Sequence, residues 1–129
     1  MKTLISWIAI MHDFSRNPST KQINGINGNG PTFNFHKDFF NHDRHIILSS
    51  EKGDNPDPYI ERLRTVLAGR YPDRTIETRY LDVTDVIDIP QIKTKVEGLL
   101  LRECKDDEIN IFFSPGTSAM QISWYLIHA

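Results

Sequence analysis

The chain has 129 residues, which suits one domain with a single hydrophobic core of ordinary size. Its formal net charge of -2 argues against a domain that grips duplex nucleic acid by the backbone, since such domains are usually basic. A single cysteine, Cys104, excludes an internal disulfide and a cysteine-rich zinc site, and no apolar run approaches the length of a membrane span. We expect a cytoplasmic protein that carries neither a metal nor a cofactor.

Four short apolar runs predict β-strands, at residues 4–10, 45–49, 75–81 and 109–114. The first is nearly continuous in apolar residues, as a strand covered on both faces is. In the third, Ile76, Thr78 and Tyr80 alternate with charged residues, which is typical of an edge or half-exposed strand.

Four helices are predicted between and after these strands, at residues 31–42, 58–71, 89–103 and 117–129. The third has the clearest signature, because Asp88 can cap it and Pro90 fits its first turn. The segment before the first helix, residues 11–30, is expected to be a long polar loop. Its Asn/Gly-rich part, residues 24–30, lacks core-forming residues and is expected to be mobile.

Strand–helix alternation of this kind predicts an α/β, Rossmann-like fold: a mostly parallel, open sheet with flanking helices. Ligands of such sheets bind outside the carboxyl ends of the strands. That rule nominates four loops, at residues 11–30, 49–57, 81–88 and 114–118. Because four strands make a small sheet, we expect residues 1–129 to be one domain at the amino-terminal end of a longer protein.

The most informative loop is Ser-Pro-Gly-Thr-Ser, residues 114–118, between the last strand and the last helix. A turn of small residues at a helix start leaves backbone N–H groups free, and the helix dipole adds partial positive charge there. This combination suits a phosphate-sized anion. A tight connection with no ligand explains the same residues equally well.

Catalytic machinery is not evident in the sequence. No nucleophile–base pair, phosphate-binding glycine loop or histidine pair at metal-ligand spacing is present. His12-Asp13 follows the first strand and can supply a donor or general base, although an exposed loop pair is the simpler explanation. Residues 42–45 are expected to be solvated surface, and Asp85 and Asp88 to be helix caps.

The order of elements and the segment at residues 114–121, Ser-Pro-Gly-Thr-Ser-Ala-Met-Gln, resemble CARF domains, the CRISPR-associated Rossmann-like sensors. The form Pro-Gly-Thr with Met-Gln is most similar to the amino-terminal sensor domain of RtcR-type regulators of RNA repair. There a CARF-like sensor precedes an AAA+ ATPase and a DNA-binding domain. The long Asn/Gly loop before Pro31 departs from the family pattern.

This resemblance implies a sensor of short cyclic or linear oligonucleotides, such as oligoadenylates, that controls an attached effector. Backbone N–H groups at residues 116–118 are expected to hold phosphate, Gln121 to read a base or ribose, and Phe14 to stack on a base. The full set of expected ligand-binding residues is His12, Asp13, Phe14, Ser15, Ser50, Asn55, Ser114, Pro115, Gly116, Thr117, Ser118 and Gln121.

CARF sensors pair across a two-fold axis, and the last helix carries apolar residues on two faces. We expect one face, with Met120, Trp124 and Ile127, to form a homodimer interface, unless further chain covers it. Two other functions stay open: metal-independent cleavage of a cyclic oligonucleotide, with Thr117, Ser118 and His12 as candidates, and a purely structural dimerisation module. A non-enzymatic sensor is the preferred interpretation.

Overall fold

The computed structural model describes residues 1–112, 115 and 117–128. Its central sheet has four parallel strands in the order β5-β4-β1-β6. Their bounds are β1 Lys2–Trp7, β4 Arg44–Ser49, β5 Thr75–Tyr80 and β6 Glu108–Ile111. The helices are α1 Pro31–Asp38, α2 Tyr59–Arg70, α3 Ile89–Glu103 and α4 Ser118–His128. The predicted parallel α/β architecture is therefore confirmed.

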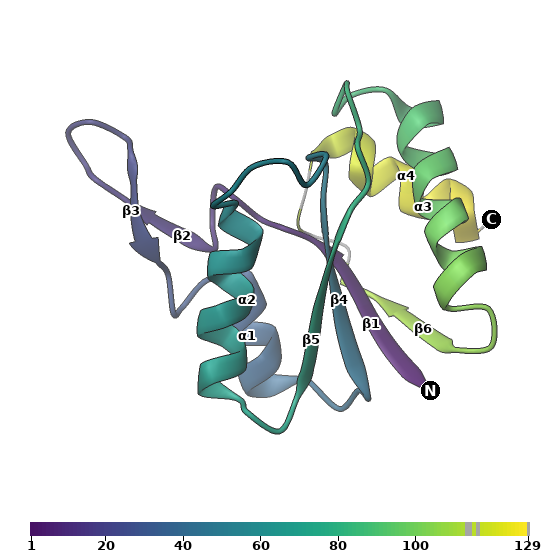
Figure 1. Cartoon of the computed structure of the whole chain (residues 1–129), viewed down its shortest axis with the longest axis horizontal. Helices are drawn as coiled ribbons and strands as arrows, with labels where there is room; N and C mark the ends of the chain where they lie inside the picture. Colours follow the sequence, from purple (N-terminus) through teal and green to yellow (C-terminus); the bar gives the residue numbers. More distant parts are fainter. Residues whose placement is uncertain (113–114, 116, 129) are drawn as a thin grey trace.

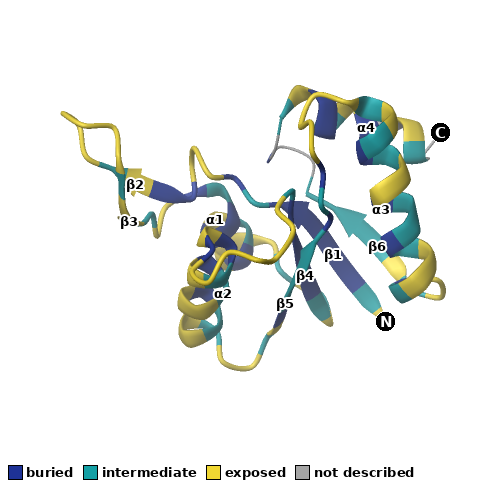
Figure 2. Cartoon of the chain, turned by 45° about the horizontal axis from the view of Figure 1, so that its top comes forward, coloured by how far each residue is buried: buried dark blue, intermediate teal, exposed yellow. Residues whose placement is uncertain are grey.

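The helices form two layers, one on each face of the sheet, as Figure 1 shows. On one side, α1 and α2 pack through Phe33, Ile60 and Leu63 against Ile47 of β4. On the other, α3 and α4 cover a larger cluster that contains Ile5, Trp7, Ile46 and Leu48 of the sheet. β1 lies in the middle of this sandwich, and every residue after Lys2 is buried, as the dark blue strand in Figure 2 shows. Burial on both faces accounts for the apolar Leu4, Ile5 and Trp7, and the strand also buries the polar residues Thr3 and Ser6.

The third helix has the bounds that its sequence predicts, residues 89–103. Asp88 caps it by accepting a hydrogen bond from the Gln91 backbone N–H at 3.1 Å. Ile92, Val96 and Leu99 form the buried stripe toward the sheet. β5 occupies the edge of the sheet, as its alternating pattern predicts. These features of the structure agree with the sequence predictions because helix caps and strand alternation are local signals.

The loop expected at residues 11–30 contains a β-hairpin, which is a correction to the sequence analysis. β2, Phe14–Arg16, pairs antiparallel with β3, Ile23–Ile26, and the hairpin projects from the body of the molecule in Figure 1. Asn17 closes its turn by accepting from the backbone N–H groups of Ser19 and Thr20. Phe14, Ile23 and Ile26 attach its base to the cluster under α2. Three-residue and four-residue strands leave too little alternation to recognise in sequence.

Asp13 connects this segment to the start of α1. It is fully buried, and its two carboxylate oxygens accept from the Thr32 backbone N–H at 2.9 Å and the Thr32 hydroxyl at 2.7 Å. Gly30, the N-cap position of α1, has no side chain to cap the helix, so Asp13 does this from a distance in sequence. Burial raises the pKa of the Asp13 carboxyl, although the bonds from Thr32 oppose that shift.

Two histidines lie in a buried chain of hydrogen bonds, which corrects the expectation that residues 42–45 are solvated surface. Arg74 donates to Nδ1 of His36 at 2.9 Å, His36 contacts His45 at 2.9 Å, and His45 contacts the Ser6 hydroxyl at 2.8 Å. A guanidinium can only donate, so it fixes His36 Nδ1 as an acceptor. His36 Nε2 must then donate to His45 Nδ1, and His45 Nε2 to Ser6 Oγ. Both imidazoles are therefore neutral, each in one tautomer.

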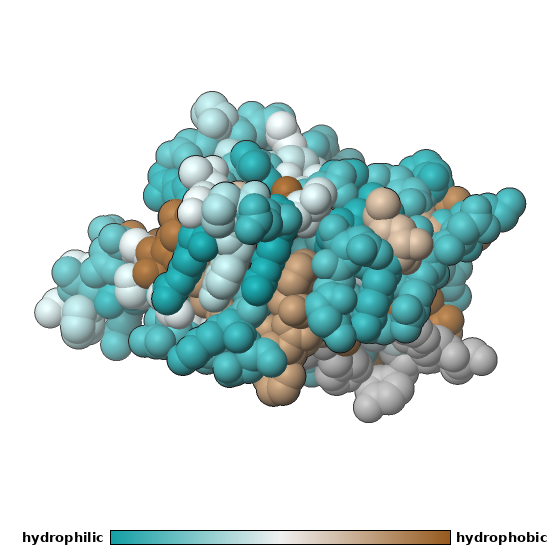
Figure 3. Space-filling model, turned by 90° about the horizontal axis from the view of Figure 1, so that it is seen from below, coloured by the Kyte–Doolittle hydropathy of each residue, from teal (hydrophilic) through white to brown (hydrophobic). Residues whose placement is uncertain are grey.

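The face at the amino ends of the strands is mostly hydrophilic, with hydrophobic residues in small separate areas (Figure 3). Arg44 at the start of β4 organises part of this region by bonding Glu77 at 3.2 Å and Asp107 at 2.9 Å. Within the described residues, no helix is long and apolar enough to cross a membrane.

Candidate functional site

A cleft of about 960 Å³ lies at the carboxyl ends of the central strands. All four loops that the sequence nominates contribute to it, through Met11, Ser50, Val86 and Thr117 among others. The loops meet there because parallel strands end at the same edge of a sheet. The place of the cleft thus follows from the topology, and the sequence analysis anticipated it.

The cleft is apolar on much of its wall, with a limited set of polar side chains. The larger apolar residues are Trp7, Ile8, Ile10, Met11, Phe14, Val86 and Met120. The polar residues are His12, Asn27, Asn29, Ser50, Thr117 and Gln121. None of the described residues that line it is a lysine, arginine, aspartate or glutamate. Such a site suits flat or neutral groups with hydrogen-bonding edges better than a densely charged anion.

Thr117 is the N-cap of α4, beside the cleft. Its hydroxyl accepts from the Met120 backbone N–H at 3.2 Å and donates to the Val86 carbonyl at 2.7 Å. One hydroxyl thereby caps a helix and fastens the loop that precedes α3. This arrangement gives Thr117 a structural task in addition to the ligand contact that the sequence predicts.

Thr117→Val is therefore expected to lower the free energy of unfolding by about 1–2 kcal/mol, because the cap and the bond to Val86 are both lost. Thr117→Ser keeps the hydroxyl and is the matched control, with an expected change below about 0.5 kcal/mol. Urea unfolding of both variants measures the difference. Equal stability of the two variants would show that the hydroxyl bonds to Met120 and Val86 do not stabilise the protein.

Six of the residues predicted to bind ligand line the cleft: His12, Phe14, Ser50, Pro115, Thr117 and Gln121. Phe14 is almost entirely buried and meets Tyr59 edge to face, with ring centroids 5.4 Å apart. It therefore forms part of the wall, where only its exposed edge is available to a base. The ligand contacts of all six residues stay predictions.

Four other predicted residues lie outside the lining. Asp13 is buried and engaged by Thr32, while the Ser15 hydroxyl donates to Asn24 at 2.9 Å on the hairpin. Asn55 is exposed and accepts from the Asp57 backbone N–H at 3.0 Å. Ser118 is exposed at the first position of α4. The two remaining residues, Ser114 and Gly116, lie outside the described residues.

The sequence analysis missed Trp7, Ile10, Asn27, Asn29 and Val86 as lining residues. Asn27 donates from its side chain to the His12 carbonyl at 3.1 Å, and its backbone N–H donates to the Asp13 carbonyl at 2.9 Å. These bonds attach the Asn/Gly segment to the loop after β1 and bring Asn29 to the cleft. The asparagines themselves were the available signal, but their composition was interpreted only as a sign of mobility.

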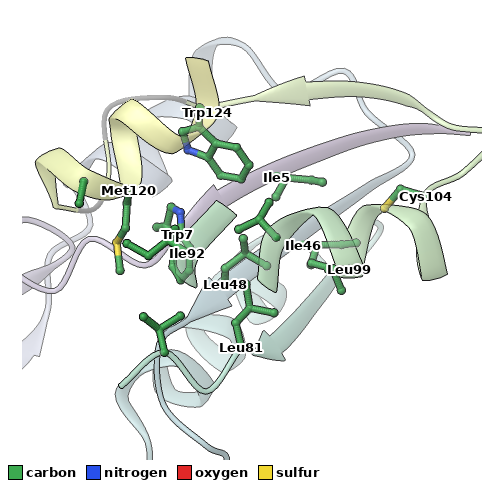
Figure 4. Packing of buried hydrophobic residues seen from close by; sticks show 13 residues of the cluster. Ile5, Trp7, Ile46, Leu48, Leu81, Ile92, Leu99, Cys104, Met120 and Trp124 are labelled. Atoms are coloured by element: carbon green, nitrogen blue, oxygen red, sulfur yellow. The ribbon is translucent and has the colours of Figure 1, made fainter. Parts of the chain in front are cut away.

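The face of α4 assigned to a homodimer is a third correction. Trp124 is 1% exposed and Met120 is 6% exposed, and both belong to the hydrophobic cluster between α4 and the sheet. Ile127 packs against the same cluster. Figure 4 shows Met120 and Trp124 directed toward Trp7 and Ile5. Met120 and Trp124 therefore cover the protein's own sheet and are not free to meet a partner, whereas Ile127 is partly exposed.

Metal chemistry has no evident basis in this site. The part of the chain that the structure describes contains no group of three or more His, Cys, Asp or Glu side chains placed to hold a metal ion. His12 is the one imidazole among the described lining residues.

The fold and the cleft together define a Rossmann-like α/β domain with a cleft at the carboxyl edge of its sheet. No protein-family model matches the chain, and no curated protein matches it by sequence. Among solved structures, it is similar to Enterococcus italicus Csm6 bound to cyclic hexa-2'-fluoro-hexa-dAMP, with a TM-score of 0.66 and 18% identity. The match covers 98% of this chain and 30% of the Csm6 chain. This likeness supports the Rossmann-like α/β fold that the sequence predicts.

Proposed function

We propose that this domain senses a short oligonucleotide, cyclic or linear, that binds in the cleft at the carboxyl ends of β1 and β4. The observation that carries the proposal is the cleft of about 960 Å³ at this edge, in a fold shared with a protein solved with a cyclic hexanucleotide. The volume suits part of such a ligand, since small-molecule sites commonly measure about 300–1,000 Å³.

The chemistry of the lining supports a division of the ligand between the two parts of the cleft. Apolar walls from Trp7, Ile10 and Val86 suit the faces of bases, and the Asn29 and Gln121 amides suit their edges. The amino-terminal end of α4 suits a phosphate, because helix N–H groups and the dipole favour negative charge. Phosphates therefore lie toward this end and toward solvent, and bases lie against the apolar wall.

The wider role belongs to the same proposal. The chain spans about 30% of the length of the Csm6 chain that it matches. The proposed role of the sensor is to control an attached effector. The similarity of residues 114–121 to RtcR-type regulators supports an AAA+ transcription activator as that effector. A homodimer, if one forms, must use a surface other than the buried face of α4.

Binding without cleavage is the preferred activity. The Thr117 hydroxyl is engaged by Val86 and Met120, which leaves His12 as the general-base candidate among the described lining residues. Incubation with labelled cyclic oligoadenylate tests this directly. Intact ligand after prolonged incubation supports a sensor, whereas linear products that vanish in His12→Ala support cleavage.

Calorimetry with cyclic hexaadenylate tests the binding proposal, together with two asparagine variants. Asn29→Ala removes an amide from the cleft and is expected to weaken binding by about 1–2 kcal/mol, as loss of one hydrogen bond to a buried partner does. Asn41→Ala removes an equal, exposed amide near the amino ends of the strands and is the control. No binding by the parent protein to cyclic or linear oligoadenylates of several lengths would overturn the proposed function.

A further inference from the structure

Among the residues that the structure describes, three buried side-chain N–H groups have no hydrogen-bond partner: Trp7 Nε1, Arg16 Nε and Trp124 Nε1. Buried donors without acceptors are uncommon in folded proteins, because they lose their bonds to water without replacement. Each such group therefore calls for an explanation. The two indoles are especially informative, since they belong to the same hydrophobic cluster.

The two tryptophans differ in one respect. Trp7 lines the cleft and is 1% exposed, whereas Trp124, also 1% exposed, lies in the cluster behind it and is not among the lining residues. Both rings belong to the same hydrophobic cluster as Met120 (Figure 4). An acceptor that enters from the cleft meets Trp7 first.

The electrostatics of the cleft decide what kind of acceptor fits. None of the described lining residues is a lysine or arginine, so a phosphate against the indole would be desolvated with no cationic partner. A nucleobase carries neutral acceptors in its ring nitrogens and carbonyls, and its flat faces suit the surrounding apolar wall.

We propose that the Trp7 indole N–H recognises a nucleobase by donating a hydrogen bond to one of its neutral acceptors. This inference rests on the proposed function and adds a recognition residue to it. It explains an unpaired donor at the wall of a cleft, since the missing bond is made when ligand binds. Folding alone leaves the donor unpaired.

Met120 is the side chain that moves in this proposal. The Trp7 nitrogen is covered in the ligand-free protein, and Met120 lies beside Trp7 in Figure 4 and also lines the cleft. Methionine is unbranched and flexible, so it can shift aside, which breaks the contact of its sulfur with the Thr117 backbone N–H at 3.3 Å. The base then takes its place against the indole.

The test compares Trp7→Phe with Trp124→Phe. Both changes remove an unpaired buried donor and the same ring volume from one cluster, so their effects on packing are matched. Trp7→Phe is expected to weaken cyclic hexaadenylate binding about 5-fold to 30-fold, which is the loss expected for one hydrogen bond to a desolvated partner. Trp124→Phe is expected to change affinity less than about 2-fold.

Fluorescence gives a second measurement that does not depend on the stability of Trp7→Phe. The chain has two tryptophans, so Trp124→Phe leaves Trp7 as the sole indole reporter. Its emission should shift when cyclic hexaadenylate binds, and an abasic oligomer with the same number of phosphates should leave it unchanged.

The outcomes separate this inference from the function on which it rests. If the parent protein binds no oligoadenylate, the proposed function is wrong and the inference falls with it. If the parent binds but both phenylalanine variants lose affinity equally, or Trp7 emission does not respond, the Trp7 contact is wrong and the sensor function stands. A response to the abasic oligomer equal to that for cyclic hexaadenylate also overturns recognition of a base.

Discussion

Gly30→Ala is expected to lower the free energy of unfolding by about 2–4 kcal/mol, as a sum of overpacking and a lost helix cap. A Cβ at this position would lie 2.6 Å from the His12 carbonyl oxygen and 2.9 Å from Asp13 Oδ1. Both neighbours are held in place, because Asp13 is fully buried and bonded to Thr32. The backbone angle φ of -71° is open to any residue, so contact is the cause.

Gly69→Ala is the matched control for this substitution. Gly69 lies in α2, and nothing comes within 4 Å of a Cβ added there. Alanine favours a helix over glycine by about 0.5–1 kcal/mol, so this variant is expected to be more stable than the parent. Urea denaturation of the two variants should therefore show shifts of opposite sign. A Gly30→Ala protein as stable as the parent would show that the loop after β1 adjusts freely.

Acidification from pH 6.5 to 5 is expected to lower the free energy of unfolding by about 2–4 kcal/mol through His36 and His45. Burial lowers the pKa of His36 from 6.5 to about 3, with the positive charge of Arg74 acting in the same direction. Burial also lowers the pKa of His45 well below 6.5. In the unfolded chain both imidazoles take up protons below pH 6.5, whereas in the folded protein they stay neutral.

The direction of the stability change with pH follows from this difference in proton uptake. Stability from a depressed histidine pKa is complete above pH 6.5 and is lost as the pH falls toward the folded value, because protons favour the unfolded chain. Asp13 has the opposite effect on the free energy of unfolding, because its pKa is raised. The pKa values of Glu61 and Glu103 are lowered, so these two groups change the stability mainly below pH 4.5. The histidines therefore dominate the pH dependence of the free energy of unfolding between pH 6.5 and 5.

The double variant His36→Gln/His45→Gln isolates the effect, because amides can donate and accept but do not titrate in this range. Chemical unfolding at several pH values should give a flatter profile for the variant than for the parent between pH 6.5 and 5. Parallel profiles would mean that the histidines are not buried and neutral in solution.

Local patterns in the sequence determined much of this fold. The α3 bounds, the Asp88 cap and the edge position of β5 were predicted correctly, because each depends on residues a few positions apart. The position of the cleft was also predicted, since any parallel α/β sheet gathers its loops at one edge.

Contacts between distant residues were beyond sequence reasoning. The cap of α1 comes from Asp13, 19 positions before Thr32, and the α4 N-cap Thr117 reaches Val86, 31 positions away. His45 was expected at the surface because residues 42–45 lie at a helix-to-strand turn, at the end of the sheet opposite the nominated loops. Its burial depends on His36 and Ser6, which supply hydrogen bonds from other elements.

The sequence by itself determined that this protein is a parallel α/β domain whose loops meet at one edge of the sheet, because strand and helix periodicities depend on neighbouring residues. Tertiary structure decided which face of α4 is buried and which residues form the cleft. An apolar helix face shows only that it must be covered, and only packing shows that the sheet covers Met120 and Trp124. Likewise, Trp7 was interpreted as part of a strand, and only its place at the cleft with an unpaired N–H marks it as a candidate for recognition.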